Sequence, residues 1–435
     1  MAKNTPTSLR QTVIYQVYNR NHNESGTFHE LIQDLHRIKS LGVDILYLLP
    51  IHPIGQKDKK GSLGCPYSIQ NYREVNPEYG TLEDFKALIK ATHEHDMKLM
   101  IDVVFNHTSR DSHLLKTHPE WFYRNEAGEF ANHVGDWSDI TDFDYTKDSA
   151  LWDELIDTLK YWASLGVDGY RCDVASLVPI DFWLRARDEV AKIKPDFLWL
   201  AESVHGGFVT YIRLLGYEAA SDSEVFQAFD ICYDYDVFEE YQDYLRGKRP
   251  LSEYIQKVAA QEYIYPENYM KLRCLENHDQ DRAAHLIPNI DQLFTWTGFI
   301  YLQKGTTMIY AGQEALDTNR PSLFDIDKVN WSRYNEYGLA DYMKQLSDLK
   351  HEAIMVEGFY EIKLGDVADT VVLSYETDQL KRIAIFNFSS KSGFVSIQVE
   401  DGAYIDCLTK QKVKVEDGKL RLEVRPIIFD TVKNS

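Results

Sequence analysis

A predicted helix ends and an apolar strand begins within Leu165-Gly166-Val167-Asp168-Gly169-Tyr170-Arg171-Cys172-Asp173. Gly166 can end the helix because glycine adopts the left-handed backbone of a helix C-cap at little cost. The strand that follows is mostly apolar until Arg171 and Asp173, so charged side chains stand at its C-terminal end. Leu41-Gly42-Val43-Asp44 repeats the same helix-stop and strand-start pattern. Both stretches indicate a chain in which helices and strands alternate.

Short strand-like runs alternate with helical patterns from about residue 13 to residue 350. The runs are nearly continuous in Val, Ile, Leu and Tyr, which is typical of parallel strands buried on both faces. Eight strands are predicted, at residues 13–18, 45–50, 99–105, 169–174, 198–203, 229–233, 271–275 and 307–310. Apolar residues at helical spacing predict helices between them, for example at residues 27–41, 81–95 and 149–165. Eight strands with helices between them indicate an α/β fold, a (β/α)8 TIM barrel, rather than an open doubly wound sheet.

Two segments depart from the barrel pattern. Residues 107–144 follow the third strand, are rich in His, Trp, Asn and Asp, and lack clear periodicity, so we expect a short excursion domain over the barrel mouth. Beyond Gly358, alternating residues predict strands such as 370–375, 382–388, 394–399, 419–424 and 426–430, which is typical of a C-terminal antiparallel β-sandwich. The predicted catalytic barrel covers residues 1–106 and 145–352, and the sandwich covers residues 353–435. No disordered linker separates them, so we expect the sandwich to pack against the barrel.

Composition limits the classes of partner. The chain has 435 residues, 44 % of them hydrophobic, which is enough for one large domain and one or two small ones. Its formal net charge of −21 disfavours nucleic acid and anionic membranes and favours a neutral or cationic ligand, although an acidic surface also serves solubility alone. The 28 Tyr and 8 Trp suit stacking on sugars, but they are also ordinary core residues. Nothing in the sequence indicates an oligomeric state.

Localisation is predicted from two patterns. The N-terminus leads into no signal-peptide pattern, and no apolar run is long enough to cross a membrane. The five cysteines are widely spread and have no metal-type spacing, so we expect reduced thiols in a cytoplasmic protein.

Charged side chains at strand ends supply candidate catalytic groups, because active sites of parallel barrels lie at the C-terminal ends of the strands. Side chains alternate along a strand, so Arg171 and Asp173 share one face. A positive neighbour lowers the pKa of an Asp and keeps it ionised, as a nucleophile requires, although a structural Arg–Asp pair is an alternative. Glu202 ends the apolar run 197–201, and apolar surroundings raise the pKa of a carboxyl enough for a general acid. A helix-capping Glu is the alternative there.

Two further polar clusters follow predicted strands. Asn277-His278-Asp279 offers donors and an acceptor that can grip neighbouring sugar hydroxyls, or it forms an ordinary polar turn. Asp102 and His107 stand at the end of the third strand, where a core Asp is the plain alternative. Four clusters in this order, with two carboxylates in opposed environments, meet the needs of glycoside hydrolysis. No serine elbow, phosphate loop, dinucleotide fingerprint or zinc spacing competes with them.

At these residues the chain resembles the α-amylase family of retaining glycoside hydrolases, over the barrel, the excursion domain and the sandwich. The resemblance implies that Asp173 is the nucleophile, that Glu202 is the acid and then the base, and that Asp279 holds the hydroxyls of the distorted sugar. The carboxyl groups of Asp173 and Glu202 should lie about 5 Å apart, as in retaining enzymes. Arg171 would orient Asp173, and Asp102 would support the barrel end. The implied substrate-binding residues are Tyr67, which resembles the family's stacking tyrosine, Asp102, His107, Arg171, His278 and Arg320.

Calcium is the only cofactor that the resemblance introduces. Family members often bind it between the barrel and the excursion domain, and Asn106 and Asp142 match two ligand positions. Calcium needs more oxygen ligands than two, so a pair of ordinary polar residues is the alternative.

The expected function is double-displacement hydrolysis of α-1,4-linked glucans or malto-oligosaccharides. Ser176 and Leu177 replace a Lys-His pair that many endo-acting amylases carry, and Asn277-His278-Asp279-Gln280 with Arg282 resembles the oligosaccharide α-glucosidases of the family. An α-1,6-glucosidase and an α-glucan transglycosylase are alternatives. A catalytically inactive amylase-fold binding protein is another, although such a protein has no chemical need to keep Asp173, Glu202 and Asp279 together.

Overall fold

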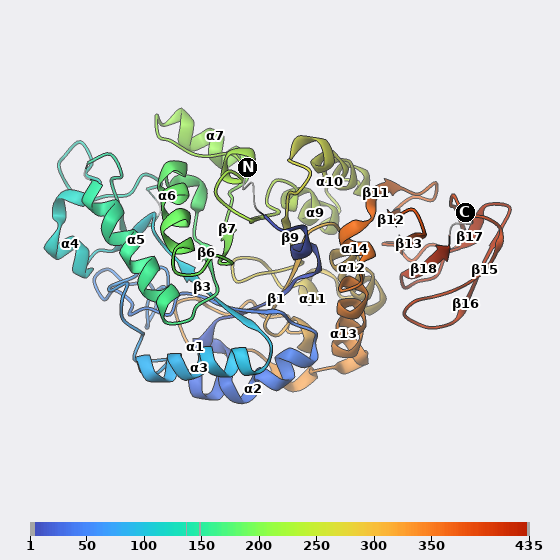
Figure 1. The fold of residues 1–435 in the computed structure, drawn as a ribbon, viewed down its shortest axis with the longest axis horizontal. Coiled ribbons are helices and arrows are strands. Elements are labelled where there is room, and N and C mark those ends of the chain that lie inside the picture. The colour runs from blue at the N-terminus through green and yellow to red at the C-terminus, as the bar shows by residue number, and fades with distance from the viewer. Residues whose placement is uncertain (1–4, 136, 148, 433–435) are drawn as a thin grey trace. The chain divides into compact units, whose positions relative to one another are not determined.

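The computed structural model describes residues 5–135, 137–147 and 149–432 (Figure 1). Within these residues, eight strands form a closed barrel in the order β1-β10-β9-β8-β7-β6-β3-β2, and the strand pairs run parallel. The predicted (β/α)8 barrel is therefore confirmed. Its strands are β1 (Val13–Val17), β2 (Ile45–Leu48), β3 (Lys98–Val103), β6 (Gly169–Cys172), β7 (Leu198–Ala201), β8 (Ile231–Tyr233), β9 (Lys271–Arg273) and β10 (Thr306–Tyr310).

Two compact units make up the described chain. The first contains residues 14–236 and 320–329, and the second contains residues 6–13, 237–319 and 330–432. The domain limits inferred from the sequence stay predictions.

Local sequence explains the helices of the first unit. Helix α2 (Phe28–Ser40) begins after Thr27, whose hydroxyl accepts the Glu30 N–H, and it buries Leu31, Leu35 and Ile38 at helical spacing. Helix α3 (Leu82–Glu94) begins with the predicted capping box, which joins Thr81 and Asp84. Helices α2 and α3 lie side by side (Figure 1). The other helices of the unit are α1 (Asn19–His22), α4 (His113–Thr117), α5 (Ser149–Ser164), α6 (Ile180–Ala191), α7 (Gly206–Leu214) and α8 (Asp222–Val225).

The excursion segment starts and finishes in one small antiparallel sheet. Strand β4 (His107–Ser109) pairs with β5 (Ile140–Asp142), and His107 lies opposite Asp142. This pairing brings the two ends of the segment together directly beyond β3. Among the described residues, no helix combines the length and the apolar character that a membrane crossing requires.

The second unit contains six α-helices among its described residues and the C-terminal sheets. The helices are α9 (Phe238–Leu245), α10 (Leu251–Ile264), α11 (Ala283–Leu286), α12 (Ile290–Leu302), α13 (Leu339–Lys350) and α14 (Ile354–Glu357). One sheet has the order β11 (Phe359–Leu364), β12 (Thr370–Glu376), β13 (Leu380–Asn387) and β18 (Ile427–Val432). The other has the order β14 (Phe394–Ser396), β17 (Lys419–Arg421), β16 (Lys412–Glu416) and β15 (Gly402–Ile405).

The two sheets share an apolar core, as expected for a sandwich. Val372 and Ile385 of the first sheet belong to the same buried cluster as Val395 and Val415 of the second. The predicted antiparallel sandwich is confirmed, and its first sheet packs on a barrel helix. The ring centroids of Trp296 and Phe299, both on α12, lie 4.2 Å and 5.2 Å from the ring centroid of Phe388.

Candidate active site

The predicted catalytic residues fall in both units: Asp173 and Glu202 in the first, and Asp279 in the second. In the first unit one guanidinium joins three carboxylates. Arg171 Nη1 donates to both oxygens of Asp102 at 2.9 Å and 3.1 Å and to Asp173 Oδ1 at 2.8 Å. Its Nη2 lies 3.0 Å from Glu202 Oε2. The structure thus brings Asp173 and Glu202 together on neighbouring strand ends, as the sequence predicted.

Exposure separates these four residues into two pairs. Arg171 and Asp102 have no exposed surface, whereas Asp173 and Glu202 keep 7 % and 8 % exposed. The latter two carboxylates can therefore meet a ligand. Arg171 and Asp102 are fully buried beside them, and the orienting and supporting roles that the family resemblance implied stay predictions.

The predicted direction of the Asp173 pKa shift is wrong. Burial raises the pKa of Asp173 well above its usual value, the Glu202 carboxylate raises it further, and the Arg171 guanidinium opposes both effects. The Arg171 guanidinium, two residues away, is evident in the sequence, whereas the Glu202 carboxylate comes close to Asp173 only through the pairing of β6 with β7.

A strained turn after Asp173 completes this arrangement. Val174 has φ 35° and ψ 45°, a left-handed conformation that is an outlier for a β-branched residue and costs roughly 1–3 kcal/mol. The turn aims the Val174 N–H at Glu202 Oε2, which accepts it at 2.8 Å. Glu202 therefore sits in a buried but partly polar environment rather than the wholly apolar one that the sequence predicted.

Tyr67 is held close to this cluster by Asp102. Its hydroxyl donates to Asp102 Oδ2 at 2.9 Å, and the hydroxyl of Tyr47 donates to the same oxygen at 2.6 Å. Burial raises the pKa of both phenols, so both stay neutral donors. Tyr47 was missed from the sequence, although its place on β2, beside the strand of Asp102, was a usable signal.

His107 is 5 % exposed, and its ring centroid lies 5.6 Å from that of Trp137. Burial lowers the pKa of His107, and the carboxylates of Asp142 and Asp139 partly oppose this shift. A neutral imidazole offers one donor and one acceptor, which suits a contact with a sugar hydroxyl.

Asn106 and Asp142, the two residues of the calcium prediction, contact each other, and Asp142 also contacts His133. Asn106 Nδ2 donates to Asp142 Oδ1 at 3.4 Å, and Asp142 Oδ2 accepts the backbone N–H of His133 at 2.8 Å and contacts its Nδ1 at 2.6 Å. Both Asp142 oxygens are thus engaged by nitrogen, whereas calcium needs about 6–8 oxygen ligands. No group of three or more His, Cys, Asp or Glu side chains within residues 5–135, 137–147 and 149–432 is arranged to hold a metal ion.

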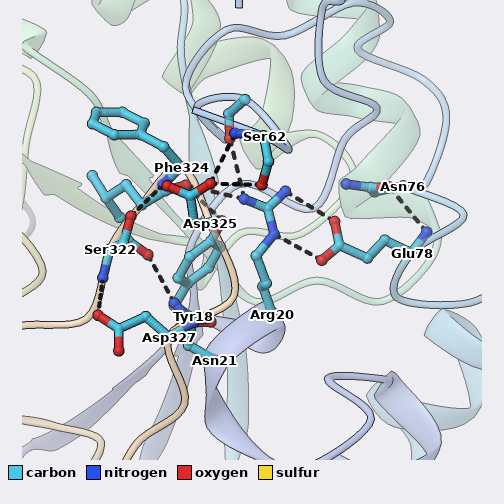
Figure 2. A network of polar contacts seen from close by, with 12 residues as sticks. Tyr18, Arg20, Asn21, Ser62, Asn76, Glu78, Ser322, Phe324, Asp325 and Asp327 are labelled. Atoms are coloured by element: carbon cyan, nitrogen blue, oxygen red, sulfur yellow. Dashed lines mark hydrogen bonds and ion pairs between the residues drawn. The ribbon is translucent and has the colours of Figure 1, made fainter. Parts of the chain in front are cut away.

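The loop that carries Tyr67 is anchored by a buried arginine. Figure 2 shows the Arg20 guanidinium between Glu78 and the segment 322–327; its Nε and Nη2 donate to Glu78 at 2.7 Å and 2.9 Å. Arg20 Nη1 also donates to the carbonyls of Gly64 and Leu323, each at 3.1 Å. The network thus ties the loop after β2 to the segment 320–329. Arg320, predicted to touch a sugar, begins that segment and is exposed.

Ser176 and Leu177 lie in a short 3-10 turn (Ala175–Leu177) directly after the strained Val174. They line a cavity of about 580 Å³ together with Tyr217, whose hydroxyl bonds that of Tyr123 at 3.0 Å. An aromatic pair, from the excursion segment and the residues after α7, therefore borders Ser176 and Leu177.

In the second unit, Asp279 belongs to a rigid turn after β9. The Asn277 side chain accepts the Asp279 N–H at 2.9 Å, and His278 Nε2 lies 3.1 Å from Asp279 Oδ2. The side chain of Asp279 is 41 % exposed, whereas that of His278 is 1 % exposed. A carboxylate fixed in this way and open to solvent can accept hydrogen bonds from a ligand.

A buried ion pair holds this turn. Arg282 Nη1 donates to Glu276 Oε1 at 2.6 Å, and the other Glu276 oxygen accepts the Ala283 N–H at 2.5 Å. Arg282 also donates to the carbonyls of Ala311 and Asn319 at 3.0 Å and 3.1 Å. In the sequence Arg282 is only a point of resemblance, and its pairing with Glu276 is evident only in the structure.

Comparisons with known proteins agree with this geometry. A family model described as "Alpha amylase, catalytic domain" matches residues 14–120 and 116–361, and one described as "Bacterial Alpha amylase C-terminal domain" matches residues 361–429. An α-amylase from Lactobacillus plantarum is similar in structure with a TM-score of 0.95 and 43 % identity, over 98 % of this chain and 100 % of that chain. A maltogenic α-amylase from Thermotoga neapolitana has a TM-score of 0.88 and 29 % identity over 98 % and 100 % of the two chains.

Two curated relatives are more distant in sequence. An α-1,4-glucan:maltose-1-phosphate maltosyltransferase from Picrophilus torridus is 24 % identical over 86 % of this chain, which spans 61 % of that enzyme's length. An α-glucosidase from Schizosaccharomyces pombe is 26 % identical over 74 % of this chain and 68 % of its own length. Because the catalytic-domain model covers most of its length, the chain belongs to the α-amylase family of glycoside hydrolases.

Proposed function

We propose that this chain is a retaining hydrolase of α-1,4-linked glucans or malto-oligosaccharides. The observation that carries the proposal is the pair of partly exposed carboxylates, Asp173 and Glu202, held by one buried guanidinium. Glycoside hydrolysis needs two carboxyl groups beside the scissile bond. The names of the similar proteins, α-amylase, α-glucosidase and maltosyltransferase, support an α-glucosyl substrate.

Asp173 would attack the anomeric carbon and form a β-glycosyl ester, while Glu202 donates its proton to the leaving oxygen. Glu202 would then remove a proton from water, which attacks the ester and releases the α-anomer. Asp279 would accept hydrogen bonds from the ring hydroxyls. His107 and His278 would each bind sugar hydroxyls, and Tyr67 would stack on a sugar ring.

Asp173 must be ionised to attack. Arg171 Nη1 donates directly to Asp173 Oδ1, which favours the ionised form of Asp173 and opposes the rise in its pKa that burial and the Glu202 carboxylate cause.

The stereochemistry of the first product tests the mechanism. Hydrolysis followed by proton NMR should show the α-anomer first, and the β-anomer as the first product would overturn the retaining assignment. A fluorinated glucosyl fluoride that forms a slowly hydrolysed ester should label the peptide that contains Asp173. Asp173→Ala should abolish the adduct, and Asp188→Ala, an exposed carboxylate on α6, should keep it. An adduct on another residue would contradict the nucleophile.

Transglycosylation is a second candidate, supported by the similarity to an α-1,4-glucan:maltose-1-phosphate maltosyltransferase. In transfer, a sugar hydroxyl attacks the ester in place of water. Chromatography of the products from maltotriose and isomaltose separates the two functions, because only transfer yields products longer than the substrate. The same panel distinguishes α-1,4 from α-1,6 cleavage.

The cellular location proposed is the cytoplasm. All five cysteines are free thiols, which is usual in a reducing compartment. Fractionation of the native cells with an antibody would test this location, and recovery outside the cytoplasmic fraction would contradict it.

A further inference from the structure

A cavity of about 280 Å³ lies in the second unit, where α12 and α13 meet the loops of the C-terminal sandwich. None of its lining residues belongs to the candidate active site. The lining combines aromatic rings with flat polar groups: Phe294, Tyr337, Tyr342, Asp341, Gln345 and Arg425. We propose that this cavity is a second binding site for a glucosyl unit of an α-glucan chain.

Tyr337 is the feature that points to a ligand. Its side chain is 59 % exposed, and its backbone has φ 61° and ψ 7°, a left-handed conformation that a tyrosine rarely adopts. Asn335 at φ 54° and Gly338 at φ 76° belong to the same turn, but these residue types tolerate that conformation. The fold thus places an aromatic ring at a cavity mouth in a backbone conformation that the ring itself disfavours. The Tyr337 hydroxyl also interacts with Arg333 and Glu336, so the ring is held in position while most of its surface stays open to a ligand.

The turn that presents Tyr337 is fixed by Asn335. Its side-chain oxygen accepts the Ala340 N–H at 3.0 Å, and its Nδ2 donates to Asp341 Oδ2 at 3.0 Å. The ring and the Asp341 carboxylate are therefore held in place before a ligand arrives, which lowers the entropic cost of binding.

Further walls of the cavity are formed by two aromatic rings and a guanidinium. The rings of Phe294 and Tyr342 lie 4.7 Å apart, and the guanidinium of Arg425 lies 4.0 Å above Phe294. Arg425 Nε donates to Asp291 at 2.9 Å, so its charge is already balanced. The Tyr342 hydroxyl is buried and has no hydrogen-bond partner within the part of the chain that the structure describes.

These properties select a neutral, polyhydroxylated ligand. Apolar C–H faces of a sugar suit the exposed Tyr337 ring, and its hydroxyls match the donors and acceptors of Asp341, Gln345 and Arg425. A volume of about 280 Å³ lies just below the roughly 300–1,000 Å³ of pockets for drug-sized ligands, which suits one or two sugar rings with the remaining chain in solvent. The choice of an α-glucan among sugars rests on the proposed function.

Affinity electrophoresis in gels that contain amylopectin tests the proposal. All proteins in the gels carry Glu202→Gln, so that the polymer is not consumed. Tyr337→Asn removes the ring while keeping a residue that tolerates a left-handed backbone, and Gln345→Ala removes one polar group. Tyr337→Phe keeps the ring. Tyr263→Asn removes a tyrosine that is 81 % exposed on α10 and lies outside the cavity.

Tyr337→Asn should weaken amylopectin binding roughly tenfold, as expected for the loss of one aromatic anchor. Gln345→Ala should weaken it less, and Tyr337→Phe and Tyr263→Asn should bind as the parent does. Parent-like retardation of both Tyr337→Asn and Gln345→Ala would overturn the proposal, as would an equal loss in Tyr263→Asn. Hydrolysis of a short aryl maltotrioside, measured with Glu202 intact, should be the same in every variant. If the parent fails to hydrolyse it while retardation still depends on Tyr337, the catalytic proposal fails and the second site stands.

Discussion

Glu202→Gln changes the proposed acid by a single functional group. The carbonyl oxygen of the new side-chain amide can still accept the Val174 N–H that Glu202 Oε2 accepts at 2.8 Å, so the strained turn after Asp173 keeps its anchor. The substitution removes the transferable proton and the negative charge 3.0 Å from Arg171 Nη2. Its effect should therefore be chemical rather than structural.

The expected loss depends on the leaving group. General acid–base catalysis contributes typically about 10²–10⁴-fold, or about 3–5 kcal/mol of activation free energy. Malto-oligosaccharides need a proton on the departing sugar oxygen, so kcat/KM on them should fall by that factor. An aryl α-glucoside with an acidic phenol needs no such proton, so its first step should keep most of its rate.

The same substitution should change the pH dependence. The Glu202 carboxylate is the second largest cause of the raised Asp173 pKa, after burial. Asp173 must be ionised to attack, so activity is lost as pH falls through its pKa. Removing the Glu202 charge lowers the Asp173 pKa, and the acid limb of the profile for the aryl substrate should move to lower pH.

Steady-state kinetics on maltotriose and on an aryl α-glucoside, each over a range of pH, check these expectations. Glu239→Gln, an exposed carboxylate on α9, is the control and should leave both rates and the acid limb unchanged. Equal losses on the two substrates together with an unmoved acid limb would refute the acid role of Glu202 and its coupling to Asp173.

Three further predictions concern stability. Arg282→Ala leaves Glu276 buried without its partner and should lower the free energy of unfolding by about 3–5 kcal/mol in guanidinium chloride titrations. Arg333→Ala, in the exposed pair with Glu336, should change the free energy of unfolding little. Similar losses in the two variants would contradict the role of burial. EDTA should leave the melting temperature unchanged, because Asp142 is engaged by Asn106 and His133; a drop that added calcium restores would contradict this. Burial lowers the pKa of His52 from 6.5 to about 4, so between these pH values the unfolded chain binds a proton at His52 that the folded chain does not. The free energy of unfolding should therefore fall by about 3 kcal/mol as pH drops from 6.5 to 4. Denaturant titrations of His52→Asn should show a correspondingly smaller fall.

The sequence alone was sufficient for the architecture, because the signals for each element are local. Apolar runs predicted all eight barrel strands, and the capping residues Thr81 and Asp84 predicted the start of α3. In the sandwich, β11, β15 and β16 were not among the predicted examples. Strands β15 and β16 are largely exposed, so they carry little of the buried alternation that marks a strand.

The positions of Asp173, Glu202 and Arg171 at strand ends also followed from sequence, because side-chain alternation and strand length are fixed along the chain. Their electrostatics did not follow. The Asp173 pKa depends on burial and on a carboxylate 29 residues further along the chain, and both act through space. In the same way, only the folded structure showed that Asn106 Nδ2 and the His133 N–H donate to Asp142. Element types depend on neighbours in sequence, whereas charge and ligand geometry depend on neighbours in space, which only the tertiary structure provides.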